Sequence, residues 1–338
     1  MRILICRLSA LGDIVQATGV VRELAERQPD AEVHWVVQSG FRTVLDGLPG
    51  LAEIVEHDRH GGPLAFLRTI RRLRRNRYDV AMDFQGNWKS AALARFSGAS
   101  RVIGASRRDR RESESSILVR ETVSLGPGLP QHPAIVAWQL AKVLDPELSF
   151  RAPSLQIDES DRQSEEEAVR ALGLDPAKPI TVLIDAPRDD PRRLSPGALT
   201  RAAENSAQVI LLRGPDEGGQ PAPLGVCVLE HPSGSLRRLM ALGAILARND
   251  GHAVGPDKGA SHVFAAMGAR TTVFFGPTDP SRTGPPNARA LVAPEPPECA
   301  PCNRTTCVEP AGNLCMAFFQ REAVERHRPE GWTDPPEC

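Results

Sequence analysis

The chain has 338 residues, of which 41% are hydrophobic and 25% charged, and its formal net charge at pH 7 is -1. This composition is ordinary for a folded globular protein of roughly two domains, and the small net charge argues against a nucleic-acid partner. No apolar run reaches the roughly 18 residues of a membrane-spanning helix, and no signal-peptide pattern precedes the first strand. We therefore expect a cytoplasmic protein whose cysteines stay mostly reduced.

Strand and helix patterns alternate from the beginning of the chain. In residues 14–30 the apolar residues recur at the spacing of one helix face, with Val15, Val20, Val21 and Leu24 on that face. An alternating order of strands and helices predicts a parallel sheet covered by helices. We expect strands at residues 1–8, 32–37, 51–57, 78–84 and 101–104, and helices at residues 14–30, 41–47, 63–76 and 87–96.

The composition changes between residues 145 and 178, where an acidic helix pattern lies between proline-containing flanks. Such a change is typical of the crossing between two domains. The sequence therefore predicts an α/β fold with domains at residues 1–155 and 156–338, facing each other across a cleft lined by strand ends. In the second domain we expect strands at residues 180–186, 207–214, 226–230, 252–255 and 271–276, and helices at residues 196–205, 235–247 and 261–267.

The loop after the first strand, RLSALGD at residues 7–13, carries a carboxylate in an unusual place. A strand, a turn of small residues and a helix usually present N–H groups to an anion, but Asp13 would repel a phosphate at the helix entrance. A carboxylate at that position is stabilised by the helix dipole, by roughly 0.3–1 kcal/mol, which is a purely structural reason for it. The same carboxylate could accept a proton from a hydroxyl group. The residues alone leave both interpretations open.

Three further stretches at predicted strand ends are rich in polar side chains: DFQGNWKSAAL at residues 83–93, VGPDKGASH at residues 254–262 and FFGPTDP at residues 274–280. Together with RLSALGD, and in this order, they resemble glycosyltransferase family 9, the ADP-heptose:lipopolysaccharide heptosyltransferase family. The resemblance extends from residue 1 to about residue 319. It implies a GT-B type fold of two facing Rossmann-like domains, with the acceptor on the first and the nucleotide-sugar donor on the second. It also implies that Asp13 is the general base.

The donor side has no glycine fingerprint of the G-x-G-x-x-G or Walker type at any predicted strand end. Gly259 and the helix that follows it can bring backbone N–H groups close to a phosphate. The resemblance implies that Asp257 contacts sugar hydroxyls, that Gly259 and His262 lie at the phosphates, and that Arg192 meets them from the loop RDDPRRLSP. Lys258 stands where the family usually has Ser or Thr, and its charge could stabilise the leaving group.

Plainer interpretations of the donor side remain. His262 could be a helix residue that bonds to a neighbouring loop, and GPTDP is a turn by composition alone. The sequence also departs from the family, which has Trp in place of Leu194 and, in some members, hydroxyl residues in place of Ala186 and Pro187. These departures leave the donor sugar open. The resemblance adds Gly276, Thr278 and Asp279 to the donor side.

Arginines concentrate in two stretches of the first domain, residues 68–77 and 101–111. Such runs usually form a solvated face, but they would also attract an anionic glycolipid, with each arginine contributing about 1 kcal/mol near an anionic surface. The family motif D-x-Q-G-x-x-K-S matches at Gln85, Gly86 and Lys89, although Lys89 could merely cap or line its helix. The resemblance thus implies contact with the cytoplasmic membrane face. The expected acceptor-side residues are Arg7, Ser9, Gly12, Gln85, Lys89, Arg71 and Arg74.

Four of the seven cysteines lie late in the chain with the spacing C-x2-C-x4-C-x7-C. Four thiolates could hold a structural zinc ion, although the usual signal is two C-x2-C pairs. Free thiols or disulfides are the alternative, and the resemblance implies a structural segment in either case. The candidate zinc ligands are Cys299, Cys302, Cys307 and Cys315.

The residues and the resemblance together predict an inverting glycosyltransferase. It would move a heptose or related sugar from an ADP-sugar to a hydroxyl group of a lipopolysaccharide-core or other surface-glycan acceptor, without a catalytic metal. One alternative is a transferase of the same fold with another nucleotide sugar. A second is a non-catalytic protein that binds a nucleotide-sugar or glycolipid without turnover. A nicotinamide oxidoreductase is disfavoured by the missing glycine fingerprint and by Asp13.

Overall fold

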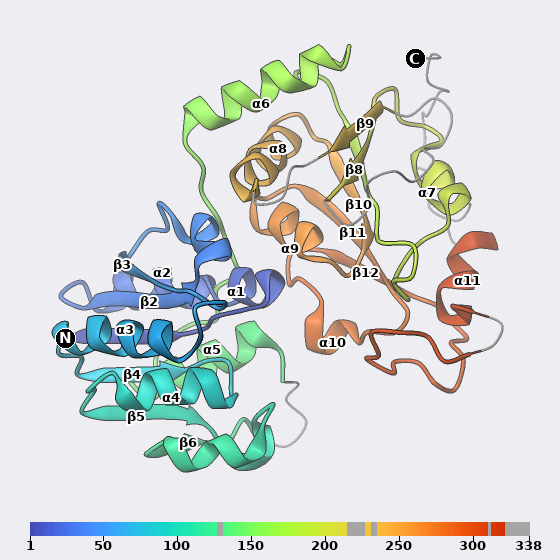
Figure 1. Cartoon of the computed structure of the whole chain (residues 1–338). Coiled ribbons are helices and arrows are strands. Elements are labelled where there is room, and N and C mark those ends of the chain that lie inside the picture. The colour runs from blue at the N-terminus through green and yellow to red at the C-terminus, as the bar shows by residue number, and fades with distance from the viewer. Residues whose placement is uncertain (127–130, 215–226, 231–234, 310–311, 322–338) are drawn as a thin grey trace. The chain divides into compact units, whose positions relative to one another are not determined.

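The computed structural model describes residues 1–126, 131–214, 227–230, 235–309 and 312–321. The chain divides into two compact units, Met1–Gln156 and Ile157–Cys338. Each unit is built around its own six-stranded parallel sheet (Figure 1). Across the described ranges, no helix is long and apolar enough to cross a membrane.

The first unit has the strand order β3-β2-β1-β4-β5-β6, with all neighbouring strands parallel. Its central strands are largely apolar because helices cover both faces of the sheet. In β1, Ile3, Leu4, Ile5 and Cys6 are fully buried. The strands are β1 (Arg2–Cys6), β2 (Glu32–Gln38), β3 (Leu51–His57), β4 (Val80–Asp83), β5 (Arg101–Ala105) and β6 (Glu121–Val123).

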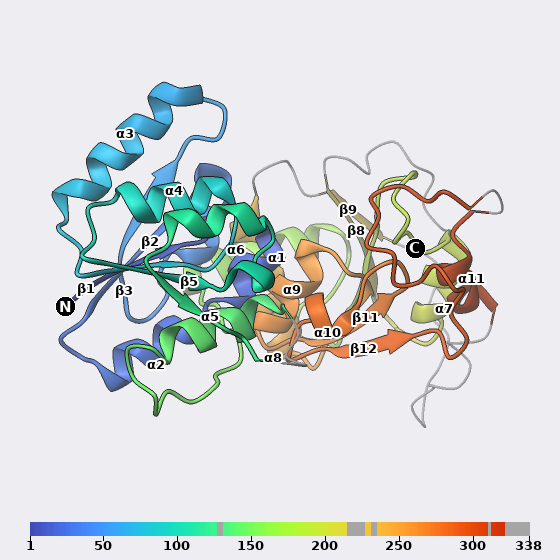
Figure 2. The same ribbon diagram turned by 90° about the horizontal axis from the view of Figure 1, so that it is seen from below.

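Helices α3 and α4 cover one face of this sheet, and α2 and α5 cover the other (Figure 2). The core beneath α3 and α4 joins Leu4 and Val102 of the sheet to Ile70 and Leu93 of the helices. The helices are α1 (Leu11–Gln16), α2 (Gly19–Arg27), α3 (Gly62–Arg75), α4 (Trp88–Phe96) and α5 (Pro133–Ala141), with 3-10 helices η1 (Ser39–Leu45), η2 (Arg107–Asp109) and η3 (Ser113–Leu118).

The second unit has the strand order β12-β11-β10-β7-β8-β9, again with parallel neighbours. Strands β7 and β10 approach closely at Gly255, where a Cβ atom would lie 2.5 Å from Ile184 Cβ. The strands are β7 (Thr181–Ile184), β8 (Val209–Arg213), β9 (Cys227–Glu230), β10 (His252–Pro256), β11 (Arg270–Phe275) and β12 (Arg289–Val292), and the helices are α6 (Glu159–Ala171), α7 (Pro196–Ala203), α8 (Leu236–Arg248), α9 (Gly259–Ala266), α10 (Pro280–Thr283) and α11 (Leu314–Arg321).

Both sheets have a point at which the strand order reverses. In the first unit the chain runs outward from β1 to β3 and then returns to the other side of β1 as β4. In the second unit the same reversal lies between β7 and β10. Open parallel sheets bind ligands at the carboxyl ends of the strands at this point. The loops that follow β1, β4, β7 and β10 are therefore the places to look for a site.

Some expected elements differ in the structure. Residues 14–30 form two helices, α1 and α2, and the break between them lets Gly19 pack where a Cβ would lie only 2.2 Å from the Arg151 carbonyl oxygen. The helix expected at residues 41–47 is the 3-10 helix η1. The patterns do not predict β6, β12, α5 or α11. Residue 226, the first of an expected strand, and residues 322–338 of the second predicted domain lie outside the described residues.

His252, at the start of β10, makes the stability of the second unit depend on pH. Burial, with smaller contributions from Arg270 and Arg289, lowers the pKa of His252 from 6.5 to about 4. Between these values the unfolded chain takes up a proton that the folded chain does not, so stability falls as the pH falls from 6.5 to 4. From pH 7 to pH 4 this group is expected to cost about 3 kcal/mol.

The measurement is urea denaturation at pH 7 and pH 4 for the wild type and for His252→Gln. Gln can keep the hydrogen bond to the Thr272 hydroxyl, which lies 2.9 Å from His252 Nε2. The variant should lose about 3 kcal/mol less than the wild type over this range. Equal losses would show that His252 is not responsible.

Candidate functional site

Asp13 lies at the carboxyl ends of β1 and β4, where the order of the first sheet reverses. It is the third residue of α1, and its side chain is 27% exposed. Its Oδ2 atom pairs with the Arg7 guanidinium and accepts a hydrogen bond from Ala10 N at 3.4 Å. Arg7 is in turn held by a 2.7 Å hydrogen bond from its Nη1 to the carbonyl oxygen of Phe84. One carboxylate oxygen is thus fixed, whereas Oδ1 accepts no hydrogen bond from any residue that the structure describes.

Gln85 connects the two loops that meet at this reversal. Its Oε1 atom accepts a hydrogen bond from Leu8 N at 2.8 Å, and its Nε2 atom donates to the Ser9 hydroxyl at 3.3 Å. Leu8 and Ser9 belong to the loop that leads to Asp13. The turn after β4 therefore fixes the path of the loop after β1.

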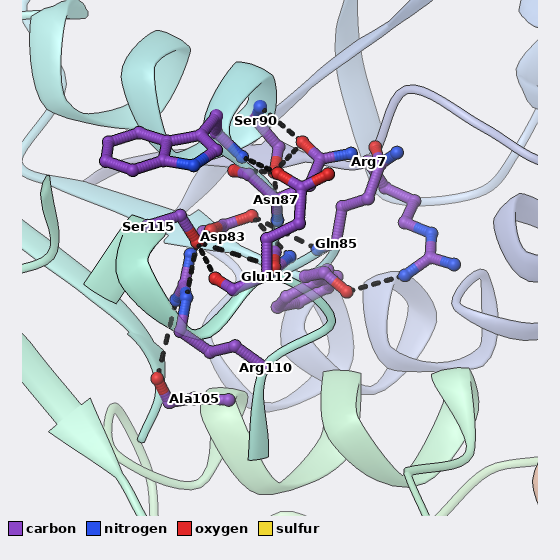
Figure 3. A network of polar contacts seen from close by, with 12 residues as sticks. Arg7, Asp83, Gln85, Asn87, Ser90, Ala105, Arg110, Glu112 and Ser115 are labelled. Carbon is purple, nitrogen blue, oxygen red and sulfur yellow. Dashed lines mark hydrogen bonds and ion pairs between the residues drawn. The ribbon is translucent and has the colours of Figure 1, made fainter. Parts of the chain in front are cut away.

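A buried ion pair stabilises the turn after β4. Asp83, the last residue of β4, accepts hydrogen bonds at Oδ1 from Gln85 N (3.1 Å) and Gly86 N (3.0 Å), and its Oδ2 pairs with Arg110. Figure 3 shows these contacts. Both side chains of the pair are completely buried. Gly86 has φ +71°, a conformation that favours glycine. Gly104 leaves the space for the guanidinium, because a Cβ there would lie 2.7 Å from Arg110 Nη1.

The remaining acceptor-side predictions near this edge are Gly12 and Lys89. Gly12 lies in α1 beside Asp13. Lys89 is exposed in the first turn of α4, and its charge contributes to the lowered pKa of His57, for which burial is the larger cause. The structure thus brings Arg7, Ser9, Gly12, Gln85 and Lys89 to the same edge of the sheet as Asp13. Their roles toward an acceptor stay predictions.

Arg71 and Arg74 are placed elsewhere. They lie on the exposed side of α3, which runs antiparallel to β3. Thr69 contacts His57 at the carboxyl end of β3, whereas Asn76 bonds to Glu53 near the other end. The two arginines lie between these levels, so the structure does not bring them to the loop that carries Asp13.

The second arginine-rich stretch is not a free basic patch. Arg110 is buried with Asp83, and Arg101 pairs with Glu121 at 2.7 Å. Arg107 and Arg108 are exposed but lie within 4 Å of Glu114 and Asp109, respectively. Acidic neighbours in the fold therefore offset much of the charge that the sequence shows in residues 101–111.

In the second unit, Arg192 joins the two loops at the reversal between β7 and β10. Its Nη1 atom donates to the carbonyl oxygen of Asp257 at 2.7 Å, and its Nε and Nη2 atoms bind the Asp190 carboxylate at 2.9 and 2.6 Å. The Asp190 partner raises the pKa of Arg192. Burial raises the pKa of the Asp190 carboxyl, but Arg192 and the nearby Lys258 outweigh it and lower that pKa. Arg192 and Lys258 are therefore two cations near the same carboxylate, at the ends of β7 and β10.

Asp257, the residue after β10, is 5% exposed and hydrogen-bonded on both oxygens. His262 Nε2 lies 3.0 Å from Oδ1, and the Thr283 hydroxyl donates to Oδ2 at 2.7 Å. Burial raises the pKa of Asp257, but these partners outweigh it and lower the pKa. His262 thus contacts a neighbouring loop, as its plainer interpretation expects, and at the same time orients a predicted donor-side residue.

Helix α9 begins at Gly259, with Lys258 as its N-cap residue. The first backbone N–H groups of a helix have no partner within the helix and, with the helix dipole, favour an anion. The lysine charge, the Arg192 guanidinium and the helix start therefore lie at the same strand ends. This combination suits a diphosphate better than a neutral ligand.

The GPTDP turn at residues 276–280 also has structural roles. A Cβ at Gly276 would lie 2.5 Å from Met316 Sδ and 3.0 Å from Cys315 Sγ, so the glycine allows α11 to pack on the sheet. Asp279 caps α10 by accepting from Ser281 N at 2.9 Å. Thr278 lines a cavity of about 260 Å³ that includes Gly276, Asp279 and Cys315. Donor contacts for Gly276, Thr278 and Asp279 stay predictions.

The four late cysteines differ in their exposure to solvent. Cys299 and Cys307 are exposed, Cys302 is half-buried and Cys315 is buried at the start of α11. Burial and the three neighbouring thiols raise the pKa of Cys315 to about 11. Throughout the part of the chain that the structure describes, no three His, Cys, Asp or Glu side chains are grouped to hold a metal ion. The zinc site therefore stays a prediction.

Sequence reasoning missed several residues that hold the site in place: Asp83 and Arg110 in the first unit, and Asp190 and Thr283 in the second. Asp190 has a local signal, since it lies two residues before Arg192. Thr283 and Arg110 have none, because each reaches its partner across more than 25 residues of chain.

Comparisons with known proteins agree with this architecture. The model of "Glycosyltransferase family 9 (heptosyltransferase)" matches residues 66–312. A lipopolysaccharide heptosyltransferase 1 from Pseudomonas aeruginosa is 27% identical over 328 residues, covering 91% of this chain and 87% of the relative. The structure of a family 9 glycosyl transferase from Veillonella parvula is similar with a TM-score of 0.72 at 18% identity, covering 86% of each chain. E. coli heptosyltransferase WaaC with ADP has a TM-score of 0.68 at 21% identity, covering 87% of this chain and 94% of that one.

The two Rossmann-like parallel sheets and these comparisons define a glycosyltransferase with a fold of the GT-B type, as the sequence predicts. The chain belongs to glycosyltransferase family 9, the heptosyltransferases.

Proposed function

We propose that this protein transfers a heptose or closely related sugar from an ADP-sugar to a hydroxyl group of a lipopolysaccharide-core acceptor, with inversion at the anomeric carbon. The observation that carries the proposal is Asp13, a partly exposed carboxylate with one oxygen fixed and the other free of described partners, in a chain of the heptosyltransferase family. The relatives add support, since one is a lipopolysaccharide heptosyltransferase and another was solved with ADP.

In the proposed reaction, Asp13 Oδ1 takes the proton of the acceptor hydroxyl as that oxygen attacks the anomeric carbon. A new glycosidic C–O bond forms, and the bond between the anomeric carbon and the diphosphate oxygen breaks. ADP leaves with the electron pair of the broken bond. Arg7 holds Asp13 Oδ2, so that Oδ1 is the oxygen presented to the acceptor.

The leaving diphosphate gains negative charge as the bond breaks. Arg192, Lys258 and the N–H groups at the start of α9 are the proposed groups that stabilise it. Asp257, held by His262 and Thr283, is the proposed partner of the donor sugar hydroxyls. With two cations in this role, we expect transfer to continue in the presence of EDTA.

The test is a nucleotide-release assay with ADP-, GDP- and UDP-sugars and a lipopolysaccharide-core acceptor, followed by NMR of the product. A single displacement inverts the anomeric configuration. The expected result is acceptor-dependent release of ADP and a product of inverted configuration. A retained configuration would contradict the single displacement, and binding of a nucleotide-sugar without turnover would favour the non-catalytic alternative.

A different donor sugar is the second candidate. Lys258 replaces the hydroxyl residue of the family pattern, and Leu194, which replaces the Trp, is 2% exposed in the core of the second unit. Leu194 is therefore a core residue, whereas Lys258 lies at the start of α9, where a changed side chain alters the contacts offered to a nucleotide sugar. Release of GDP or UDP in preference to ADP in the same assay would support this candidate.

Arg192→Ala is expected to weaken ADP binding by about 10- to 100-fold, because a charge-assisted contact to the diphosphate is lost. The measurement is isothermal titration calorimetry with ADP. Arg188→Ala is the matched control, since Arg188 is an exposed arginine of the same loop. Arg192→Lys should recover part of the affinity, because it restores the charge without the planar fork. Equal affinities of Arg192→Ala and Arg188→Ala would remove Arg192 from the donor site.

A further inference from the structure

Trp88 is an exposed aromatic residue at the same edge of the first sheet as Asp13. It is the first residue of α4, and it is 44% exposed. Helix α4 begins directly after the turn that follows β4, so Trp88 lies at the carboxyl ends of the strands. The Cα–Cβ bond of a helical residue is tilted toward the start of its helix. For Trp88 this direction is toward the carboxyl edge of the sheet.

The start of α4 does not depend on an indole at this position. Asn87 caps the helix, because its Oδ1 atom accepts a hydrogen bond from Ser90 N at 2.9 Å and the Ser90 hydroxyl accepts one from Asn87 N at 3.3 Å. Tryptophan has no particular preference for the first position of a helix. The core beneath α4 contains Leu93 and Ala94 of this helix and not Trp88. Helix capping and this core therefore leave the indole without a structural role.

Glu112 fixes the backbone of Trp88. Trp88 N donates a hydrogen bond to Glu112 Oε2 at 2.7 Å, and Glu112 N donates one to the Gly86 carbonyl oxygen at 3.0 Å. Figure 3 shows Glu112 beside Gln85 and Asn87 in this turn. The backbone that carries the indole is thus already held in place. A ligand would have to order only the two side-chain torsions of Trp88.

A short series of contacts connects Trp88 to the loop of Asp13. Gln85, three residues before Trp88, donates a hydrogen bond from Nε2 to the Ser9 hydroxyl at 3.3 Å. The next residue, Ala10, donates from its N–H group to Asp13 Oδ2 at 3.4 Å. Three residues of chain span at most about 11 Å, a distance comparable to the length of a disaccharide. Trp88 is therefore within reach of a saccharide whose hydroxyl group faces Asp13.

We propose that Trp88 binds the acceptor by stacking its indole on the C–H face of a sugar ring. A pyranose ring carries its hydroxyl groups around the rim and presents C–H groups on a face, which is therefore apolar. A rigid indole offers a matching apolar plane at low cost in conformational entropy. The motif D-x-Q-G-x-x-K-S leaves position 88 undefined, so the residue there can distinguish one acceptor from another. The inference rests on the proposed function, which supplies the saccharide acceptor.

The first test is tryptophan fluorescence of the full-length protein during titration with a lipid-free lipopolysaccharide-core oligosaccharide, without donor. Among the tryptophans that the structure describes, Trp35 is fully buried and Trp138 is half-buried, with its Nε1 atom bonded to the Leu148 carbonyl oxygen. The oligosaccharide should change the emission of the wild type. Trp88→Phe should bind the oligosaccharide without this change. An equal change in the emission of Trp88→Phe would overturn the proposal.

The second test measures affinity for the same oligosaccharide by isothermal titration calorimetry. Trp88→Ala should bind it about tenfold more weakly, because the stacking surface is lost. Trp88→Phe keeps a flat ring and should recover most of the affinity, whereas Trp88→Leu is apolar without a ring and should not. The matched control is Phe96→Ala, since Phe96 is a 46% exposed aromatic residue at the other end of α4, and it should bind like the wild type. Equal recovery by Trp88→Leu and Trp88→Phe would overturn the proposal.

Transfer kinetics separate this inference from the proposed function. In Trp88→Ala the KM for the acceptor should rise about tenfold with little change in kcat, because the indole faces the sugar ring and not the reacting bond. The variant's fold is checked by circular dichroism. Transfer by the wild type and by Trp88→Ala with equal KM would refute the stacking alone. Binding of the oligosaccharide through Trp88 without any transfer by the wild type would refute only the proposed function.

Discussion

Replacing Asp13 by Asn is expected to lower the kcat of sugar transfer by about 10²-fold or more, because an amide cannot take the proton of the attacking hydroxyl group. The exchange keeps the shape of the side chain, and an amide oxygen can still accept the hydrogen bond from Ala10 N. The exchange also removes the counter-charge of the buried Arg7, so kcat is compared per amount of folded protein. The measurement is single-turnover transfer at saturating donor and acceptor, with the fold checked by circular dichroism.

The matched control is Asp46→Asn in the same unit. The Asp46 side chain is 30% exposed and faces Arg42 at 3.4 Å, so it shares the exposure and the arginine partner of Asp13 without its place at the strand ends. This control should transfer sugar at the wild-type rate. Affinity for ADP, which depends on the second unit in our proposal, should be unchanged in both variants. A rate above one tenth of wild type for Asp13→Asn would exclude the role of general base.

The position of Asp13 at the carboxyl end of β1 could be predicted because it depends only on the order of neighbouring strands and helices along the chain. Alternating strand and helix patterns predict two parallel sheets, and the carboxyl ends of parallel strands lie at one edge. The loops after β1 and β4 and those after β7 and β10 therefore had to meet in pairs, and they do. Gln85 thus contacts Leu8 in the loop that leads to Asp13, and Arg192 contacts the carbonyl oxygen of Asp257.

The partners of these residues could not be predicted, because they come from distant parts of the chain. Arg110 reaches Asp83 over 27 residues, and Thr283 reaches Asp257 over 26. No periodicity or turn signal encodes such a pairing. The sequence instead places Arg110 among four other arginines, where a basic patch is the natural expectation. The fold buries it, and only the three-dimensional arrangement distinguishes an internal cation from a surface one.

The direction in which α3 runs along β3 could not be predicted from the sequence either. A run of arginines at residues 68–77 predicts a positively charged surface. It does not predict where along the strands each arginine lies. Contacts of Thr69 with His57 and of Asn76 with Glu53 fix that position. These contacts place Arg71 and Arg74 away from the loop of Asp13.

Arg110→Met is expected to destabilise the first unit by about 3–5 kcal/mol, because it leaves the carboxylate of Asp83 buried without its counter-charge. Both side chains are 0% exposed, so water cannot replace the lost partner. The measurement is the free energy of unfolding from urea denaturation. The matched control is Arg101→Met, which breaks the half-exposed pair with Glu121 in the same sheet and should cost less than about 1 kcal/mol.

The double variant Asp83→Asn/Arg110→Met should recover part of the loss, because the remaining amide is neutral and can still accept from Gln85 N and Gly86 N. If the pair also positions the loop of Asp13 through Gln85, the double variant should fold and yet transfer sugar more slowly than the wild type. A double variant as unstable as Arg110→Met alone would show that the stability lies in the packing of the arginine and not in the charge that it neutralises. The Asp83 carboxylate, neutralised by Arg110, holds the turn that carries Gln85. The same ion pair therefore contributes to the stability of the first unit and to the position of the loop with the proposed base, Asp13.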